Sequence, residues 1–149
     1  MTLDIGFNCF SEKRGVMKLL DVNSLTSLGI RRAFCGYDSL EIQGCRSLTS
    51  IAIQDYCFNG NDNQSLSLHD LPVLKSVEVR DICFVSFVGV SIENNPSLEL
   101  MTFENECFSQ KKGVFAMSNN AVFKHLRVSR KCFCNFIPDW KSTFFLLVS

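Results

Sequence analysis

The sequence predicts a repeat solenoid of mainly parallel β-structure, with short turns and few helices. Two observations predict it. An apolar-x-apolar pair recurs every 23 to 26 residues, and a second such pair lies between successive copies of the first. Alternation of apolar with other residues is typical of strands rather than helices. One unit of this length cannot bury an apolar stripe alone, so the units are expected to stack into a continuous core.

The first ladder of pairs has six copies. Its members are Leu3/Ile5, Leu28/Ile30, Ile51/Ile53, Val77/Val79, Met101/Phe103 and Leu126/Val128. Three residues before the last five copies stands another apolar residue, namely Leu25, Leu48, Leu74, Leu98 and Phe123. Six residues after the first member of each pair comes an aromatic and sulfur dipeptide. The dipeptides are Cys9-Phe10, Phe34-Cys35, Cys57-Phe58, Cys83-Phe84, Cys107-Phe108 and Cys132-Phe133, with the order reversed in the second copy.

The second ladder completes the unit as strand, turn, strand, turn. Its pairs are Met17/Leu19, Leu40/Ile42, Leu66/Leu68, Val90/Ile92 and Phe115/Met117. We expect one solenoid of about six units over residues 3–133, followed by a C-terminal edge segment over 134–149. The insertion at 59–64 and the segment after Phe133 are expected to bulge or fray. The apolar run at 144–148 is expected to form a last strand or to cover the sheet edge.

Composition narrows the class of function. The 149 residues allow one domain, and 15 Lys plus Arg balance 15 Asp plus Glu, which gives a formal net charge of zero. The broad basic field that nucleic acid requires is therefore missing, and we expect no nucleic-acid partner. No apolar stretch is long enough to predict a signal peptide or membrane insertion. Localisation stays open: intracellular if both ends are genuine, and the cell surface if the chain is an excerpt of a larger protein.

The L-x-x-φ-x-φ core, the repeat length and the residues Cys45, Asn95 and Asn120 at inward turns resemble the leucine-rich repeat family. Units that end in Cys-Phe are most similar to the BspA-like subgroup of microbial surface and secreted proteins. The resemblance implies a right-handed solenoid with a parallel sheet on its concave face, where a partner binds. Catalysis is not what the resemblance implies.

The eight cysteines raise the alternative of a redox or metal-binding protein. Five of them share one repeat position and Cys35 lies one residue off it, so they are expected to be small buried hydrophobic residues. The only close pair is Cys132 and Cys134, which is not the C-x₂-C spacing of zinc sites, so we expect no metal and no cofactor. Disulfides stay open if the protein is exported, although side chains stacked in register point the same way.

Nothing in the sequence singles out a catalytic centre, and we expect no enzyme. Cysteine nucleophiles need a nearby base, and the only histidines, His69 and His125, are expected on different flanks. The phosphate-binding G-x-x-x-x-G-K motif, the hydrolase G-x-S-x-G motif and the zinc-binding H-E-x-x-H motif do not occur.

The best candidate site is the outward face of the first ladder. Residues between and after its apolar pairs point away from the core. Those that we expect to contact a protein partner are Arg31, Gln54, Glu78, Arg80, Thr102, Glu104 and Arg127. The predicted function is a non-catalytic protein-binding module; a structural or adhesive fragment of a larger microbial surface protein is the alternative. Since the first residues do not resemble a polar cap, two alternatives stay open: the chain is an excerpt of a longer array, or it associates end to end with a second copy.

Overall fold

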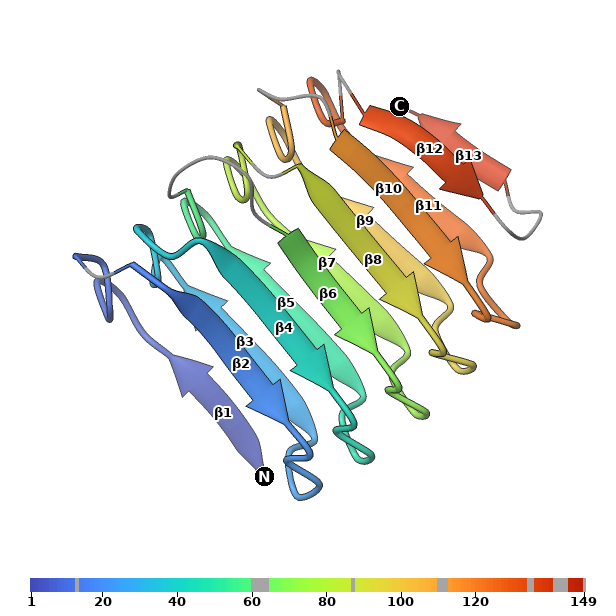
Figure 1. Cartoon of the computed structure of the whole chain (residues 1–149), viewed down its shortest axis with the longest axis horizontal. Coiled ribbons are helices and arrows are strands. Elements are labelled where there is room, and N and C mark those ends of the chain that lie inside the picture. Colours follow the sequence, from blue (N-terminus) through green and yellow to red (C-terminus); the bar gives the residue numbers. More distant parts are fainter. Residues whose placement is uncertain are drawn as a thin grey trace.

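The computed structural model describes residues 1–12, 14–59, 65–86, 88–109, 113–133, 136–140 and 145–148, and these contain no helix. The chain winds between two parallel sheets, as Figure 1 shows. The seven-stranded sheet is ordered along the chain as β1 (Thr2–Ile5), β3 (Ser27–Arg31), β5 (Ser50–Gln54), β7 (Ser76–Val79), β9 (Leu100–Phe103), β11 (His125–Val128) and β13 (Phe145–Val148).

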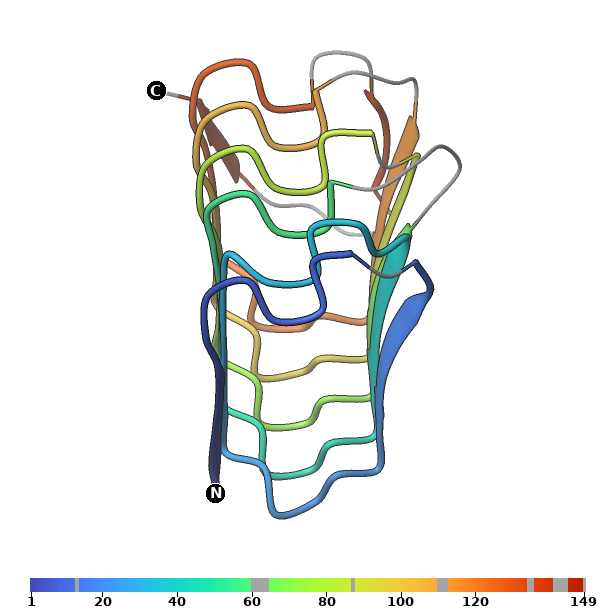
Figure 2. The same ribbon diagram turned by 90° about the vertical axis from the view of Figure 1, so that its left-hand side faces the viewer.

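The six-stranded sheet lies opposite the first one. Its strands are β2 (Val16–Leu20), β4 (Ser39–Gln43), β6 (Ser65–His69), β8 (Gly89–Glu93), β10 (Gly113–Ser118) and β12 (Phe136–Trp140). Figure 2 shows the stack from its side, with the two sheets facing each other and the described turns running between them. The predicted repeat solenoid of parallel strands is therefore confirmed.

Among the described residues, the strand pairings join equivalent positions of neighbouring repeats. Leu28 of the first ladder pairs with Leu3 and with Ile51. In the second ladder, Leu40 pairs with Met17 and with Leu66. The resemblance implied one parallel sheet, and the structure has two because both ladders of apolar pairs form strands.

The core lies between the two sheets. Alternate side chains point inward, so Leu28, Ile30, Leu40 and Ile42 are each almost completely buried, while the residues between them are partly exposed. Because parallel strands stack about 4.8 Å apart, each apolar side chain contacts its equivalents in the coils before and after it. The core is therefore a set of columns that run the length of the stack.

A column of phenylalanine rings fills one edge of the core. Phe10, Phe34, Phe58, Phe84, Phe108 and Phe133 stack in that order, with ring centroids 4.8 to 5.5 Å apart and planes within 8° of parallel. Stacked pairs of this kind contribute about 0.5–1.5 kcal/mol each beyond the burial of their surface. All six residues have a left-handed backbone, with φ between 52° and 56°. The turn that holds the rings is thus the same in every coil.

The ring column corrects the expectation of a reversed dipeptide in the second copy. Phe34 stacks between Phe10 and Phe58, and Ala33 before it is fully buried like the cysteines of other copies. Arg32 and Phe34 have the same positive φ as Asn8 and Phe10. The second copy therefore has Ala33 in place of the cysteine and one residue fewer before it, and Cys35 follows the ring.

The opposite edge is held by buried amides. Asn95 accepts a hydrogen bond from the Leu71 N–H at 3.1 Å and donates one to the Leu68 carbonyl at 3.1 Å. Asn120 repeats the arrangement one coil later, since it accepts from the Asn95 N–H at 3.2 Å and donates to the Ile92 carbonyl at 2.9 Å. The inward turns predicted from these amides are confirmed.

The least regular segments fall partly outside the described residues. Of the predicted bulge at 59–64, only Asn59 is described, and its side-chain amide donates to the Ile82 carbonyl at 2.6 Å. After Phe133, β12 pairs with β10 and β13 pairs with β11, both in parallel. The end of the chain thus adds one strand to each sheet, which agrees with the last strand expected near residues 144–148.

Replacing Val79 with Asp should unfold at least the central coils. Val79 is fully buried in β7, and an unpaired carboxylate there is expected to lower the free energy of unfolding by about 3 kcal/mol or more. Circular dichroism during thermal melting measures the effect, with the outward substitution Ser76→Asp in the same strand as the control. Equal melting temperatures for the wild type and Val79→Asp would contradict the inward assignment.

Replacing Asn95 with Ala should leave the Leu71 N–H and the Leu68 carbonyl without their partner. Each buried unsatisfied group costs about 1–3 kcal/mol, so we expect a loss of about 2 kcal/mol or more in urea denaturation. Asn105→Ala is the matched control, because Asn105 is exposed and its amide bonds the side chain of Asp81. A loss no larger than that of the control would show that the amide column contributes little.

Candidate functional site

The seven predicted site residues lie on the outward side of the seven-stranded sheet. Arg31, Gln54, Glu78, Thr102 and Arg127 belong to five successive strands of that sheet, and Arg80 and Glu104 directly follow β7 and β9. All seven are exposed or partly exposed. No other described element covers this outward face, which we call the outer face.

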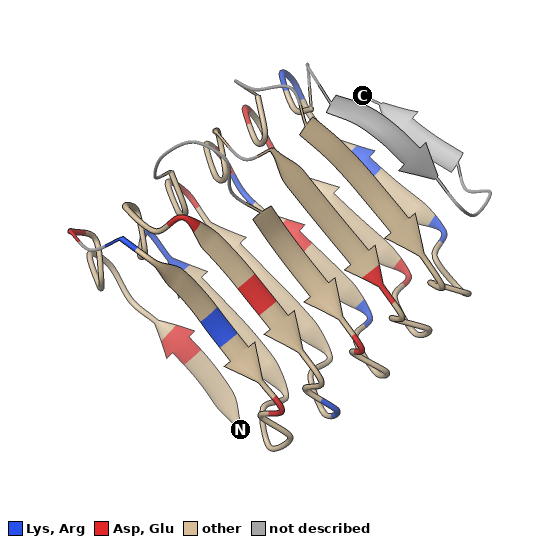
Figure 3. Cartoon of the chain, viewed as in Figure 1, with Lys and Arg blue, Asp and Glu red and all other residues tan. Residues whose placement is uncertain are grey.

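The strand register arranges these residues in rows. Glu78 pairs with Thr102, and Thr102 pairs with Arg127, which gives one row across three strands. Arg31 pairs with Gln54 in a second row. Figure 3 shows charged residues of both signs distributed over the stack. The outer face is therefore a mixed polar surface.

One ion pair links two predicted residues. The Arg80 Nε atom donates to Glu104 Oε2 at 3.3 Å across neighbouring coils. The hydrogen bond and the negative charge of Glu104 raise the pKa of the Arg80 guanidinium. Because both side chains are solvated, the pair contributes little stability. Its effect is to fix the orientation of both groups on the outer face.

The predicted residues do not converge on one point. Arg31 lies on β3 and Arg127 on β11, and β5, β7 and β9 lie between those strands. Of the seven, Arg31 and Gln54 line a small hollow of about 100 Å³, together with Phe7, Arg32, Asp55 and Tyr56. The Arg32 guanidinium carbon lies 5.2 Å from the centroid of the Tyr56 ring. We call this group the arginine–aromatic hollow.

Sequence reasoning missed Phe7, Arg32 and Tyr56 because they stand in turns, outside both ladders. A signal was nevertheless present. The place that Phe7 occupies in the first copy is taken by Asp55, Asp81, Asn105 and Arg130 in later copies, so an aromatic residue is not what the repeat itself requires.

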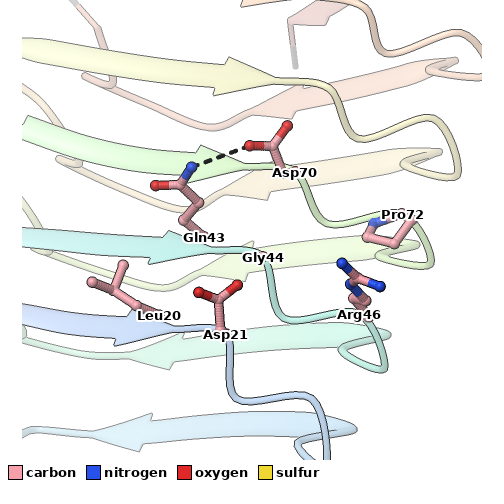
Figure 4. Close-up of a pocket in the computed structure, with 7 residues that line it drawn as sticks. All are labelled: Leu20, Asp21, Gln43, Gly44, Arg46, Asp70 and Pro72. Carbon is pink, nitrogen blue, oxygen red and sulfur yellow. Dashed lines mark hydrogen bonds between the residues drawn. The ribbon is translucent and has the colours of Figure 1, made fainter.

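A larger hollow of about 570 Å³ lies at the opposite turns and is drawn in Figure 4. It is lined by Leu20, Asp21, Gln43, Gly44, Arg46, Asp70 and Pro72. Gly44 takes the place that Asp21 and Asp70 hold in neighbouring coils, and a Cβ there would clash with an Asp21 carboxylate oxygen. The missing side chain of Gly44 thus makes room for the Asp21 carboxylate at the edge of the hollow.

The carboxylate of Asp70 at this hollow is already bonded to its neighbours. Gln43 Nε2 donates to Asp70 Oδ2 at 3.2 Å, and Asn94 Nδ2 donates to Asp70 Oδ1 at 3.0 Å. Both bonds join neighbouring coils, so Asp70 is part of the polar ladder that closes this edge of the stack.

The described cysteines are free thiols, and those of the central coils are buried while that of the first coil is exposed. Cys57, Cys83 and Cys107 are completely buried in one column, whereas Cys9 in the first coil is exposed. Their thiols bond backbone carbonyls, such as Cys57 Sγ to Gln54 O at 2.8 Å and Cys107 Sγ to Arg80 O at 3.1 Å. The expected ladder of small buried residues is confirmed for these three; Cys134 lies outside the described residues.

Thiols of neighbouring coils shift one another's pKa in two pairs, Cys57 with Cys83 and Cys107 with Cys132. Burial, followed by the contact with Cys57, raises the pKa of Cys83, and the contact with Cys132 together with burial raises that of Cys107. The pKa of each partner, Cys57 and Cys132, is lowered chiefly by the same thiol contact. A hydrogen bond from the Cys57 N–H to Cys83 Sγ at 3.4 Å also joins the first pair.

The two histidines and the acidic and sulfur-containing residues were also considered as catalytic or metal-binding groups. His69 ends β6 and His125 begins β11, so the histidines lie in different sheets, as expected. The described ranges contain no cluster of three or more His, Cys, Asp or Glu residues that could hold a metal ion. Among the same residues, no helix is long and apolar enough to cross a membrane.

Comparisons of the chain with protein-family models, with curated proteins and with solved structures found no match. The site therefore has to be interpreted from its own residues.

Brief alkylation of the native protein should label Cys9 and leave Cys57, Cys83 and Cys107 unlabelled until the chain is unfolded. Solvent exposure determines which thiols react. The pKa of Cys57 is lowered, but the reagent does not reach its buried sulfur in the native protein. Mass spectrometry of peptides from native and denatured samples locates the label. Rapid native labelling of Cys57 or Cys83 would instead support the redox or metal-binding alternative.

Proposed function

We propose that this chain is a non-catalytic protein-binding module that recognises its partner through the outer face of the seven-stranded sheet. The observation that carries the proposal is the register of that face. Glu78, Thr102 and Arg127 stand in one row on neighbouring strands, and the Arg80–Glu104 pair lies beside it. A surface with both charge signs in fixed positions favours a partner of complementary charge pattern.

The opposite face is polar in the middle of its sheet. Ser65 and Ser67 point outward on β6. Charges on this face lie on other strands, where Lys18 of β2 forms an ion pair with Glu41 of β4. Small hydroxyl side chains provide little contact area and no charge, so β6 offers a matched uncharged position on the other sheet.

Binding is favoured over catalysis because the predicted residues are spread over a surface. Active sites gather their polar groups in a concave pocket that excludes water, whereas Arg31 and Arg127 lie on strands separated by three others. Kinship with leucine-rich repeats of the BspA-like kind is part of the same proposal, and the sequence resemblance supports it. A structural or adhesive role within a larger protein remains the alternative, and end-to-end self-association stays a prediction.

Photo-crosslinking in the cells that produce the protein tests this function. Glu78 is replaced with the photoreactive residue p-benzoylphenylalanine, and the control carries it at Ser67, in the middle of β6 on the other sheet. We expect a defined protein adduct from position 78, identified by mass spectrometry, and none from position 67. A bulky charge on the same row, Thr102→Arg, should lower the adduct yield about tenfold if the row lies in the interface.

Two results would contradict the proposal. One is the same set of adducts from both positions, which would indicate nonspecific contact. The other is a folded chain that yields no adduct from position 78, with its fold verified by circular dichroism.

A further inference from the structure

The arginine–aromatic hollow brings unpaired charge and exposed apolar surface together on the outer face. It is built from three successive coils, because Phe7 follows β1, Arg31 ends β3 with Arg32 after it, and Tyr56 follows β5. Phe7 is 68% exposed and Tyr56 is 44% exposed. Exposed aromatic rings beside arginine are the composition of interface hot spots.

The two guanidinium groups are available to a ligand. Neither Arg31 nor Arg32 makes an ion pair or a side-chain hydrogen bond within the described residues, in contrast to Arg80, which is bonded to Glu104. The guanidinium carbon of Arg32 lies over the Tyr56 ring, and a cation–π contact takes up no N–H donor. Two arginines with unused donors therefore line one hollow.

Asp55 is the only acidic residue that lines the hollow, and it does not neutralise the arginines. It forms no ion pair with Arg31 or Arg32, and its negative charge also contributes to the raised pKa of Arg80 on the next coil. Two positive groups thus face one negative group, which leaves the hollow with an excess of positive charge.

The repeat does not account for these side chains. Tyr56 has a φ of 63°, a conformation that is costly for an aromatic residue, and the equivalent position in other copies is Asn8, Ile82, Glu106 or Lys131. Neither ring of Phe7 or Tyr56 belongs to the buried phenylalanine column. Packing of the stack therefore gives no reason for aromatic residues at these two places.

We propose that the arginine–aromatic hollow docks an acidic segment of the protein partner. A partner carboxylate would accept hydrogen bonds from Arg31 and Arg32, and a neighbouring apolar side chain would pack on Phe7 and Tyr56. Guanidinium groups match carboxylates because two parallel N–H···O bonds can form at once. This inference rests on the proposed function, whose partner it describes by its chemistry.

The probe is a phage-displayed library of random peptides selected on the immobilised full chain. We expect the enriched peptides to share Asp or Glu next to an aromatic or large aliphatic residue. Synthetic copies of these peptides should bind the Arg31→Gln/Arg32→Gln double variant at least about tenfold more weakly, as loss of a charged hot spot predicts. Tyr56→Ala should weaken binding as well. Arg31→Lys should also weaken it although the charge is kept, because an ammonium lacks the planar fork of a guanidinium.

The matched control is Arg46→Gln, which removes one exposed arginine at the opposite turns of the stack. Peptide affinity should not change in that variant, and circular dichroism should show the same fold for all variants. Enriched peptides without acidic residues, equal binding by the double variant, or equal weakening by Arg46→Gln would each overturn the inference. So would arginine-dependent binding of single-stranded oligonucleotides in the absence of acidic-peptide binding.

Failure of this inference can be told apart from failure of the proposed function. If position 78 still forms its protein adduct at full yield in the Arg31→Gln/Arg32→Gln chain, the outer face binds a partner and the hollow is not its anchor. If position 78 forms no adduct in the unaltered chain, the proposed function itself fails.

Discussion

In-register stacking of parallel coils is the constraint on which the whole structure depends. A strand in the middle of either sheet finds its backbone partners only in the coils immediately before and after it, at the same repeat position. A side chain that points inward in one coil must therefore fit against the equivalent side chains of the neighbouring coils. This requirement explains why phenylalanine rings stack on rings, buried amides bond to amides of the next coil, and thiols lie beside thiols. Each interaction is local to neighbouring coils, so stability adds along the stack.

The turns show how the backbone meets this constraint with very different residues. At one edge the left-handed positions are Asp21, Gly44, Asp70, Asn94 and Asn119, which are residue types that tolerate positive φ. At the ring edge the same conformation is taken by Arg32, Tyr56 and even the β-branched Ile82, at φ of 45°, 63° and 59°. Such residues adopt it at a cost that only surrounding structure can offset. The stacked phenylalanines supply that surrounding structure.

Much of this fold could be predicted from the sequence, because period-two alternation and a repeat length leave few arrangements open. The strands near Leu28 and Leu40, their inward faces and their partners all follow from the two ladders. The turn at Ala33 could not be read in the same way. Linear spacing placed Phe34 at the position of the other cysteines, whereas ring stacking aligns it with the other phenylalanines and absorbs the missing residue.

The same distinction explains the candidate site. Glu78 and Thr102 were predicted on the outer face because side-chain direction alternates along a strand. The neighbourhood of Phe7, Arg32 and Tyr56 depends on left-handed turn residues, whose side-chain directions no simple period describes. A residue whose type differs from its equivalents in the other copies was the better guide there. Phe7 is the example, because later copies have Asp55, Asp81, Asn105 and Arg130 at the same position.

The two edges of the stack also differ in how they tolerate a change of length. Leu40 and Ile51 are eleven positions apart, and so are Leu66 and Val77 as well as Val90 and Met101. All variation in repeat length therefore lies on the ring side, before or after the phenylalanine. Natural insertions and deletions can accumulate at that edge while the hydrogen-bonded amide edge keeps its size. For an engineer, the ring-side turns are accordingly the place to graft an epitope or a second binding loop.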